Sequence, residues 1–212
     1  MKIKACSFVL LLFAALPTQA QFNLWVKGGI NWNTVSIQNQ PPSTATISAD
    51  RILGYHFGFY SKIKLTDKLS LIPEVQFIQR GYIHGTSYIF PLPEATITLN
   101  YIDVPVVLSY NVYKSIAIDV GPSVGFKTST RIQTGTASSA DASETYSAPI
   151  DYGANFGIRM DILERFSVIT RYYLGFKSVT SSSPSSPSYS LSTEDTSFYN
   201  RNLHVGLAYR LK

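Results

Sequence analysis

The sequence predicts an all-β protein, an eight-stranded antiparallel up-and-down transmembrane β-barrel. Three observations predict it. Apolar and polar residues alternate along eight segments, each long enough to cross a bilayer as a tilted strand of about ten residues. The connections between these segments are alternately long and short. A secretory leader precedes them, and past Leu16 no apolar run reaches the length that a membrane helix requires.

The leader is predicted to be a signal peptide that covers residues 1–20. Lys2 and Lys4 form a basic start, residues 5–16 form a short apolar core, and Ala20 ends a stretch of small residues suited to cleavage. A membrane anchor is the alternative, but a dozen apolar residues are too few to span a bilayer. Residues 21–212 then form one domain, which is the predicted barrel.

Composition excludes several classes of function. The formal charge is +5 for the whole chain and +3 without Lys2 and Lys4, and it is spread along the sequence, so there is no nucleic-acid footprint. The single cysteine, Cys6, lies in the leader, so the mature chain has no disulfide and no thiol ligand. Three scattered histidines have no metal-ligand spacing, and no glycine-rich phosphate loop occurs. We expect no nucleic-acid partner, no metal and no cofactor.

The first four strands are predicted at residues 22–33, 52–65, 69–83 and 96–110. Each has one apolar face and one polar face, as the alternation of side chains along a strand requires. The apolar faces hold, strand by strand, Phe22, Leu24, Val26, Ile30 and Trp32; Leu53, Tyr55, Phe57, Phe59, Ile63 and Leu65; Leu71, Val75, Phe77 and Ile83; and Ile102, Val104, Val106, Leu108 and Tyr110.

The last four strands are predicted at residues 115–127, 150–161, 166–177 and 202–211, and they alternate in the same way. Their apolar faces hold Ile116, Ile118, Val120, Val124 and Phe126; Tyr152, Ala154, Phe156, Ile158 and Met160; Phe166, Val168, Tyr172, Leu174 and Phe176; and Leu203, Val205, Leu207, Tyr209 and Leu211.

The connections set the orientation. Short turns are predicted at residues 66–68, 111–114 and 163–165, and longer polar segments join the other strand ends. Outer-membrane barrels have short periplasmic turns and long extracellular loops. A cleaved leader leaves both chain ends in the periplasm, which makes the first connection extracellular, and that connection is long. Both signals therefore predict the same orientation in the cell outer membrane.

Alternation alone does not say which face is inside, because a lipocalin-type barrel is apolar inside. The polar face carries nine glycines, and glycine in a strand marks close approach of neighbouring groups, as in a crowded lumen. They are Gly29, Gly54, Gly58, Gly121, Gly125, Gly153, Gly157, Gly175 and Gly206. Large aromatics near the strand ends of the apolar face are typical of membrane-interface girdles. The polar face is therefore predicted to point inward.

The inward face carries charges of both signs: Lys27, Lys62, Glu74, Arg80, Asp103, Asp119, Asp151, Arg159 and Arg171. Eight strands enclose a lumen that side chains can fill, and buried charges must pair. We predict a side-chain-plugged lumen with a structural charge network of Glu74, Arg80, Asp103, Arg159 and Arg171. An ion pathway is the alternative. Asp103 is expected to pair with one of the three arginines, so that Asp103→Ala weakens folding by leaving a buried positive charge.

Three prolines lie within predicted strands that closure makes central: Pro73, Pro105 and Pro122. Proline cannot donate a ladder hydrogen bond. We therefore expect bulges or local breaks near them.

Five segments resemble the PorT-like outer-membrane β-barrel family, and together they extend over nearly the whole mature chain. They are Val26-Lys-Gly-Gly-Ile-Asn31, Pro73-Glu-Val-Gln-Phe77 with Arg80-Gly81, Asn100-Tyr-Ile-Asp-Val-Pro105, Gly121-Pro-Ser-Val-Gly125 and Gly206-Leu-Ala-Tyr-Arg210. The resemblance implies an eight-stranded outer-membrane barrel in a Gram-negative envelope, without an assigned activity for most members. Its name-giving member belongs to a secretion machinery. The chain departs from many outer-membrane barrels in ending on Arg210-Leu-Lys212, not on an aromatic residue.

These observations favour a non-enzymatic outer-membrane protein with a structural or interaction role, surrounded by outer-membrane lipid and presenting its long loops outward. One alternative is an accessory component of a secretion or envelope-assembly complex, with envelope proteins as partners. A second is a lipid-modifying enzyme that uses His84 with Ser87 and a carboxylate on the lipid face. Strand parity instead points His56, His84 and His204 inward. Residues 128–148 and 178–199 are the loops in which specific binding could reside.

Overall fold

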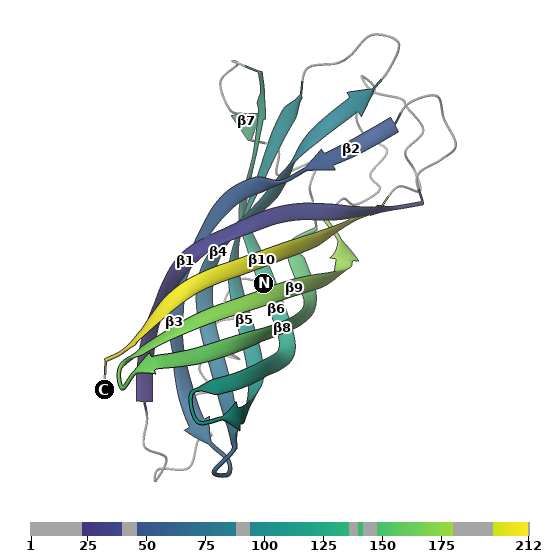
Figure 1. The fold of residues 1–212 in the computed structure, drawn as a ribbon. Coiled ribbons are helices and arrows are strands. Elements are labelled where there is room, and N and C mark those ends of the chain that lie inside the picture. The colour runs from purple at the N-terminus through teal and green to yellow at the C-terminus, as the bar shows by residue number, and fades with distance from the viewer. Residues whose placement is uncertain are drawn as a thin grey trace.

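The computed structural model describes residues 23–39, 46–87, 94–135, 140–141, 148–179 and 197–211. Eight strands form the wall of a barrel (Figure 1): β1 (Asn23–Gln38), β3 (Ile52–Lys64), β4 (Leu69–Ser87), β5 (Ala95–Tyr113), β6 (Ile116–Thr134), β8 (Ile150–Leu163), β9 (Phe166–Ser178) and β10 (Ser197–Arg210). Consecutive wall strands pair antiparallel, and β1 pairs with β10 to close the barrel. The predicted fold class is confirmed.

The two rims of the barrel differ in their connections. Short turns at residues 65–68, 114–115 and 164–165 join wall strands at the rim where β1 begins and β10 ends (Figure 1). At the opposite rim two short strands extend the wall: β2 (Thr46–Asp50) pairs with β4, and β7 (Ala140–Asp141) pairs with β6. The predicted signal peptide, residues 1–20, lies outside the described residues. In the described part of the chain, no helix is long and apolar enough to cross a membrane.

The inward and outward faces follow the predicted parity. On β3, Tyr55 and Phe57 are 49 % and 55 % exposed, whereas His56 between them is 5 % exposed. All the buried charged and amide side chains lie inside the wall, and large apolar side chains are exposed on its outer face, which confirms the polar-inside arrangement. Ile63, predicted on the outer face, is only 9 % exposed; it lies beside a break in the β3–β4 ladder.

Several wall strands run further than predicted at the long-connection rim. β4 continues to Ser87 instead of ending at residue 83, and β6 continues to Thr134 instead of ending at residue 127. β10 already begins at Ser197, within the predicted loop 178–199. Beyond the bilayer the outer face meets water, so the apolar half of the alternation disappears while the ladder hydrogen bonds continue. The periodicity of apolar residues therefore underestimates the lengths of these strands.

The three strand prolines break ladders without shifting their register. The β3–β4 pairing stops between Tyr60↔Glu74 and Ile63↔Leu71, beside Pro73. The β4–β5 ladder stops between Pro73↔Val106 and Gln76↔Asp103, opposite Pro105, and the β5–β6 ladder stops between Pro105↔Ser123 and Leu108↔Val120, beside Pro122. Local breaks were therefore the right expectation. Register shifts occur elsewhere, at Asn100/Tyr101, Asn111/Tyr113, Asp161/Leu163 and Tyr199/Arg201.

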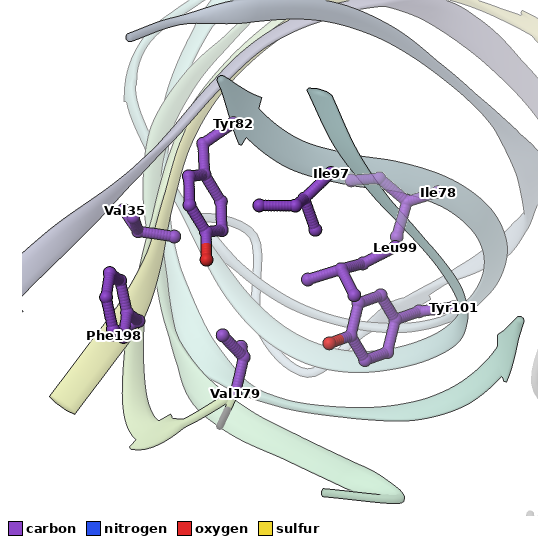
Figure 2. Close-up of a cluster of buried hydrophobic side chains, with 8 residues drawn as sticks. All are labelled: Val35, Ile78, Tyr82, Ile97, Leu99, Tyr101, Val179 and Phe198. Carbon is purple, nitrogen blue, oxygen red and sulfur yellow. The ribbon is translucent and has the colours of Figure 1, made fainter. Parts of the chain in front are cut away.

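Two apolar clusters lie inside the barrel, one toward each rim. The lower cluster, near the short turns, consists of Trp25, Tyr60, Ile72, Val107, Ile169 and Ala208. The upper cluster, toward the long connections, consists of Val35, Ile78, Tyr82, Ile97, Leu99, Tyr101, Val179 and Phe198. Figure 2 shows the side chains of the upper cluster directed toward a shared interior space, with the Tyr82 and Phe198 rings stacked 5.8 Å apart. The polar interior lies between these two clusters.

Candidate functional site

The candidate site is the charged interior of the barrel. Among the described residues, four cationic and four carboxylate side chains are buried: Lys27, Arg80, Arg159, Arg171, Glu74, Asp103, Asp119 and Asp151. Each is contributed by the inward face of a wall strand. Because the numbers of the two signs are equal, the buried charges balance, as an interior with little solvent requires.

Five of these residues form the Arg171 network. Arg171 on β9 lies 2.7 Å from Asp119 on β6 and 2.8 Å from Glu74 on β4. Arg159 donates to the same Asp119 oxygen at 2.7 Å, and Lys27 donates to Glu74. The Arg171 network therefore contains three cations and two carboxylates, and each carboxylate is shared by two cations.

The other three residues form the Arg80 network. Arg80 contacts Asp103 at 3.2 Å and Asp151 at 3.0 Å, and its guanidinium lies 3.9 Å from the centroid of the Tyr173 ring. Asn200 also donates to Asp151, at 2.8 Å. This network has one cation and two carboxylates, which offsets the excess positive charge of the Arg171 network.

Apolar layers seal the charges from both sides. Along β1 the inward side chains run from Trp25 of the lower cluster, through Lys27, to Val35 of the upper cluster. The same order recurs on β9 with Ile169 and Arg171, followed by Val179 directly after the end of that strand. Screening by water is small in such a layer, so ion pairs there interact more strongly than on a surface, and an unpaired charge is correspondingly costly.

Glycines in the wall make room for the large guanidinium groups. A Cβ added to Gly157 would lie 2.4 Å from Cγ of Arg171 and 2.2 Å from the carbonyl oxygen of Thr170. A Cβ added to Gly125 would lie 3.0 Å from Asp103 and 3.3 Å from Arg80. The glycine-lined face inferred from the sequence is therefore the face against which the networks pack.

The structure brings all five residues of the predicted network into ion pairs, but in two separate groups. Arg80 and Asp103 belong to one network, and Glu74, Arg159 and Arg171 belong to the other. Lys27, Asp119 and Asp151 were identified only as inward charges, yet each forms an ion pair. The available signal was their parity, which is the same as that of the predicted members. Lys62 stays at the rim, 3.8 Å from Asp161.

The histidines lie inside, as their parity predicted. His56 and His204 are 5 % and 4 % exposed, with ring centroids 5.3 Å apart, and His56 lies 3.4 Å from the side-chain oxygen of Asn31. His84 contacts the rings of Tyr82 and Phe198 in the upper cluster. The described residues contain no group of three or more His, Cys, Asp or Glu that could hold a metal ion. The Ser87 side chain lies outside the described part.

Comparison with known proteins shows the family of the chain and the barrel fold. Residues 18–181 match the family model described as "Outer membrane protein beta-barrel domain". Neisserial surface protein A superimposes with a TM-score of 0.51 at 9 % identity, over 89 % of this chain and 97 % of that one. Ail, the attachment invasion locus protein of Yersinia pestis, gives 0.46 at 9 % identity, over 90 % and 99 % of the two chains. The outer membrane protein OprG from Pseudomonas aeruginosa superimposes with a TM-score of 0.47 at 9 % identity, over 91 % of this chain and 97 % of that one. No curated protein sequence matches the chain.

Proposed function

Because the chain belongs to the outer membrane protein beta-barrel domain family, we propose that it is a non-enzymatic barrel with a plugged lumen and a structural or interaction role. Its place is the cell outer membrane, with lipid around the apolar wall. The single observation that supports the proposal is the Arg171–Glu74 contact of 2.8 Å, which crosses the interior from β9 to β4. With the Arg80 and Arg159 ion pairs buried in the same interior, the proposed barrel has no continuous path for ions.

The plugged lumen is tested by single-channel recording. The refolded protein, inserted into planar lipid bilayers, is expected to give no steady conductance. A variant that removes the bridge, Arg171→Ala combined with Glu74→Ala, removes one cation and one carboxylate together, and it is expected to admit water and to raise the conductance above that of the wild type. A steady, large conductance of the wild-type protein would refute the plugged lumen.

The narrower assignment to PorT-like barrels remains part of the proposal. It rests on the segment Asn100-Tyr-Ile-Asp-Val-Pro105, whose Asp103 is fully buried and bound to Arg80. An accessory role in a secretion or envelope-assembly complex follows from that assignment only by analogy. Co-purification after gentle detergent extraction tests it: a stable complex with other envelope proteins supports the accessory role, and an isolated barrel counts against it.

The non-enzymatic assignment is supported by the surroundings of His84. Its ring contacts Tyr82, which is 1 % exposed, and Phe198, inside the wall and away from the lipid-facing side where an acyl chain would bind. An assay of acyl hydrolysis or transfer on lipid A compares the wild type with His84→Ala. Activity in the wild type that the substitution abolishes would overturn the assignment.

A further inference from the structure

A cleft opens at the short-turn rim, below the lower apolar cluster. Its volume is about 300 Å³, at the lower end of the range for small-molecule sites. The lining residues are Asn23, Trp25, Lys62, Lys64, Asp161, Leu163, Glu164 and Arg210. They come from the ends of β1, β3, β8 and β10 and from the β8–β9 turn, so the cleft lies across the mouth of the barrel and faces the periplasm.

The inner end of the cleft is an aromatic stack with an unpartnered donor. The Trp25 and Tyr60 rings are stacked 5.6 Å apart and nearly parallel, at 9°. Trp25 is 6 % exposed, and within the described structure its buried indole Nε1–H has no hydrogen-bond partner. Buried donors are rarely left unpaired, so this group is an open position for an acceptor.

Charged side chains of both signs line the same cleft. Lys62 and Asp161 form a loose pair at 3.8 Å between β3 and β8, which lie on opposite sides of the wall. Within the described residues Lys64, Arg210 and Glu164 form no salt bridge, and the Arg210 guanidinium lies 5.9 Å from the Trp25 ring centroid. The cleft therefore offers two unpaired cations and one unpaired carboxylate to a ligand.

We propose that this cleft binds the free end of a short periplasmic peptide that carries an ammonium and a carboxylate on the same carbon. Arg210 and Lys64, with the Trp25 N–H, would hold the carboxylate, and Glu164 would hold the ammonium, through charge-assisted hydrogen bonds. Asp161 and Glu164 repel a phosphate dianion more strongly than a carboxylate with an adjacent ammonium group. The diaminopimelate residue in peptidoglycan stem peptides has such an end, and it occurs in the compartment that this rim faces.

The proposal deepens the interaction role proposed above and rests on it. It also requires that the short-turn rim faces the periplasm. The closed lumen and the cleft can fail separately. A steady conductance of the wild type would refute the plugged lumen and would not contradict binding in the cleft. Absence of binding at the rim would refute the proposed binding site and would not contradict the plugged lumen.

The binding test uses Trp25 as the reporter. The chain has two tryptophans, so in the Trp32→Phe variant all tryptophan fluorescence comes from Trp25, which lines the cleft. The refolded full-length variant in detergent micelles is titrated with L-alanyl-γ-D-glutamyl-meso-diaminopimelate. We expect a saturable change in Trp25 emission, and about tenfold weaker binding once the free ammonium of the diaminopimelate is acetylated.

Two further ligands separate the alternatives. Inorganic phosphate that saturates the same signal would identify a simple anion site and overturn the proposal. An N-acetylated tri-alanine with a free carboxylate that binds equally well would identify a site for protein C-termini, which also overturns it. No saturable change with the stem peptide, by emission or by calorimetry, refutes the site.

Variants assign the charges. Arg210→Gln and Glu164→Gln are each expected to weaken stem-peptide binding about tenfold, the effect of one charge-assisted hydrogen bond. Lys114→Gln, at the same rim but outside the cleft, is the matched control and should bind like the parent. The heat-dependent gel shift of each variant checks that its barrel is folded. Folded Arg210→Gln and Glu164→Gln proteins that bind like the control would refute the assignment.

Discussion

Arg171 and Glu74 join opposite walls of the barrel: their side chains are 2.8 Å apart, although β9 and β4 are separated by three strands in either direction around the wall. No local sequence feature connects two residues 97 positions apart. The contact links the two opposite walls through the interior. Removing either partner leaves the other charge buried without that ion pair. Stability should therefore depend on the two networks more than on any one strand pairing.

Glu74→Ala is predicted to be the most damaging single substitution in the networks. It leaves Lys27, Arg159 and Arg171 with Asp119 as their only carboxylate. Loss of one partner from a buried ion pair typically costs about 3–5 kcal/mol. The free energy of unfolding, measured by urea titration in detergent micelles, should fall by that amount. Asp67→Ala, on an exposed turn at the short-turn rim, is the control and should stay within about 0.5 kcal/mol of the wild type.

Asp103→Ala is predicted to cost less than Glu74→Ala. The sequence predicts that Asp103→Ala leaves an arginine without a carboxylate partner. In the structure, Arg80 would keep a second carboxylate, Asp151, at 3.0 Å. The loss is then closer to one charged hydrogen bond, about 1.5–3 kcal/mol. The same urea titration ranks the two variants. Equal or greater destabilisation by Asp103→Ala would contradict the division into two networks.

Gly29→Ala is predicted to weaken closure of the barrel, whereas Gly28→Ala is not. An added Cβ at Gly29 would lie 2.1 Å from the carbonyl oxygen of Val205 on β10, so the β1–β10 pairing that closes the wall must shift. At Gly28 the nearest atom is 3.6 Å away. Overpacking typically costs about 1–3 kcal/mol. The heat-dependent gel shift should occur at a lower temperature for Gly29→Ala, and an unchanged transition would show that the wall tolerates the methyl group.

Phe156→Arg is predicted to impair folding into lipid more than Leu163→Arg, because Phe156 lies deeper in the bilayer. Phe156 is 48 % exposed near the middle of β8, whereas Leu163, at 64 %, lies at the end of the same strand. Arginine on the lipid face costs about 2–4 kcal/mol at the bilayer midplane and about 0–1 kcal/mol near the interfaces. Folding equilibria in liposomes should show this difference between Phe156→Arg and Leu163→Arg. Equal costs would place the membrane elsewhere on the wall.

Much of the fold could be predicted because alternation is a local property with a period of two residues. Ile102, Val104 and Asp103 already separate into an outer and an inner side within the sequence, and the inward glycines indicate which side is crowded. Strand ends at the long-connection rim were predicted less well, since β4 and β6 continue to Ser87 and Thr134, where water replaces lipid. There the outer face no longer needs to be apolar, so the periodic signal ends before the strand does.

By itself, the sequence determined the eight strands, the inward set of charges and the different lengths of the connections at the two rims. Only the tertiary structure decided which charges meet: Arg171 with Glu74 and Asp119, Arg80 with Asp103 and Asp151. It also brought Trp25, Arg210 and Glu164, from three distant parts of the chain, to one cleft. The physical reason is that parity depends on adjacent residues, whereas contacts across a lumen depend on how far each strand is staggered when the sheet closes.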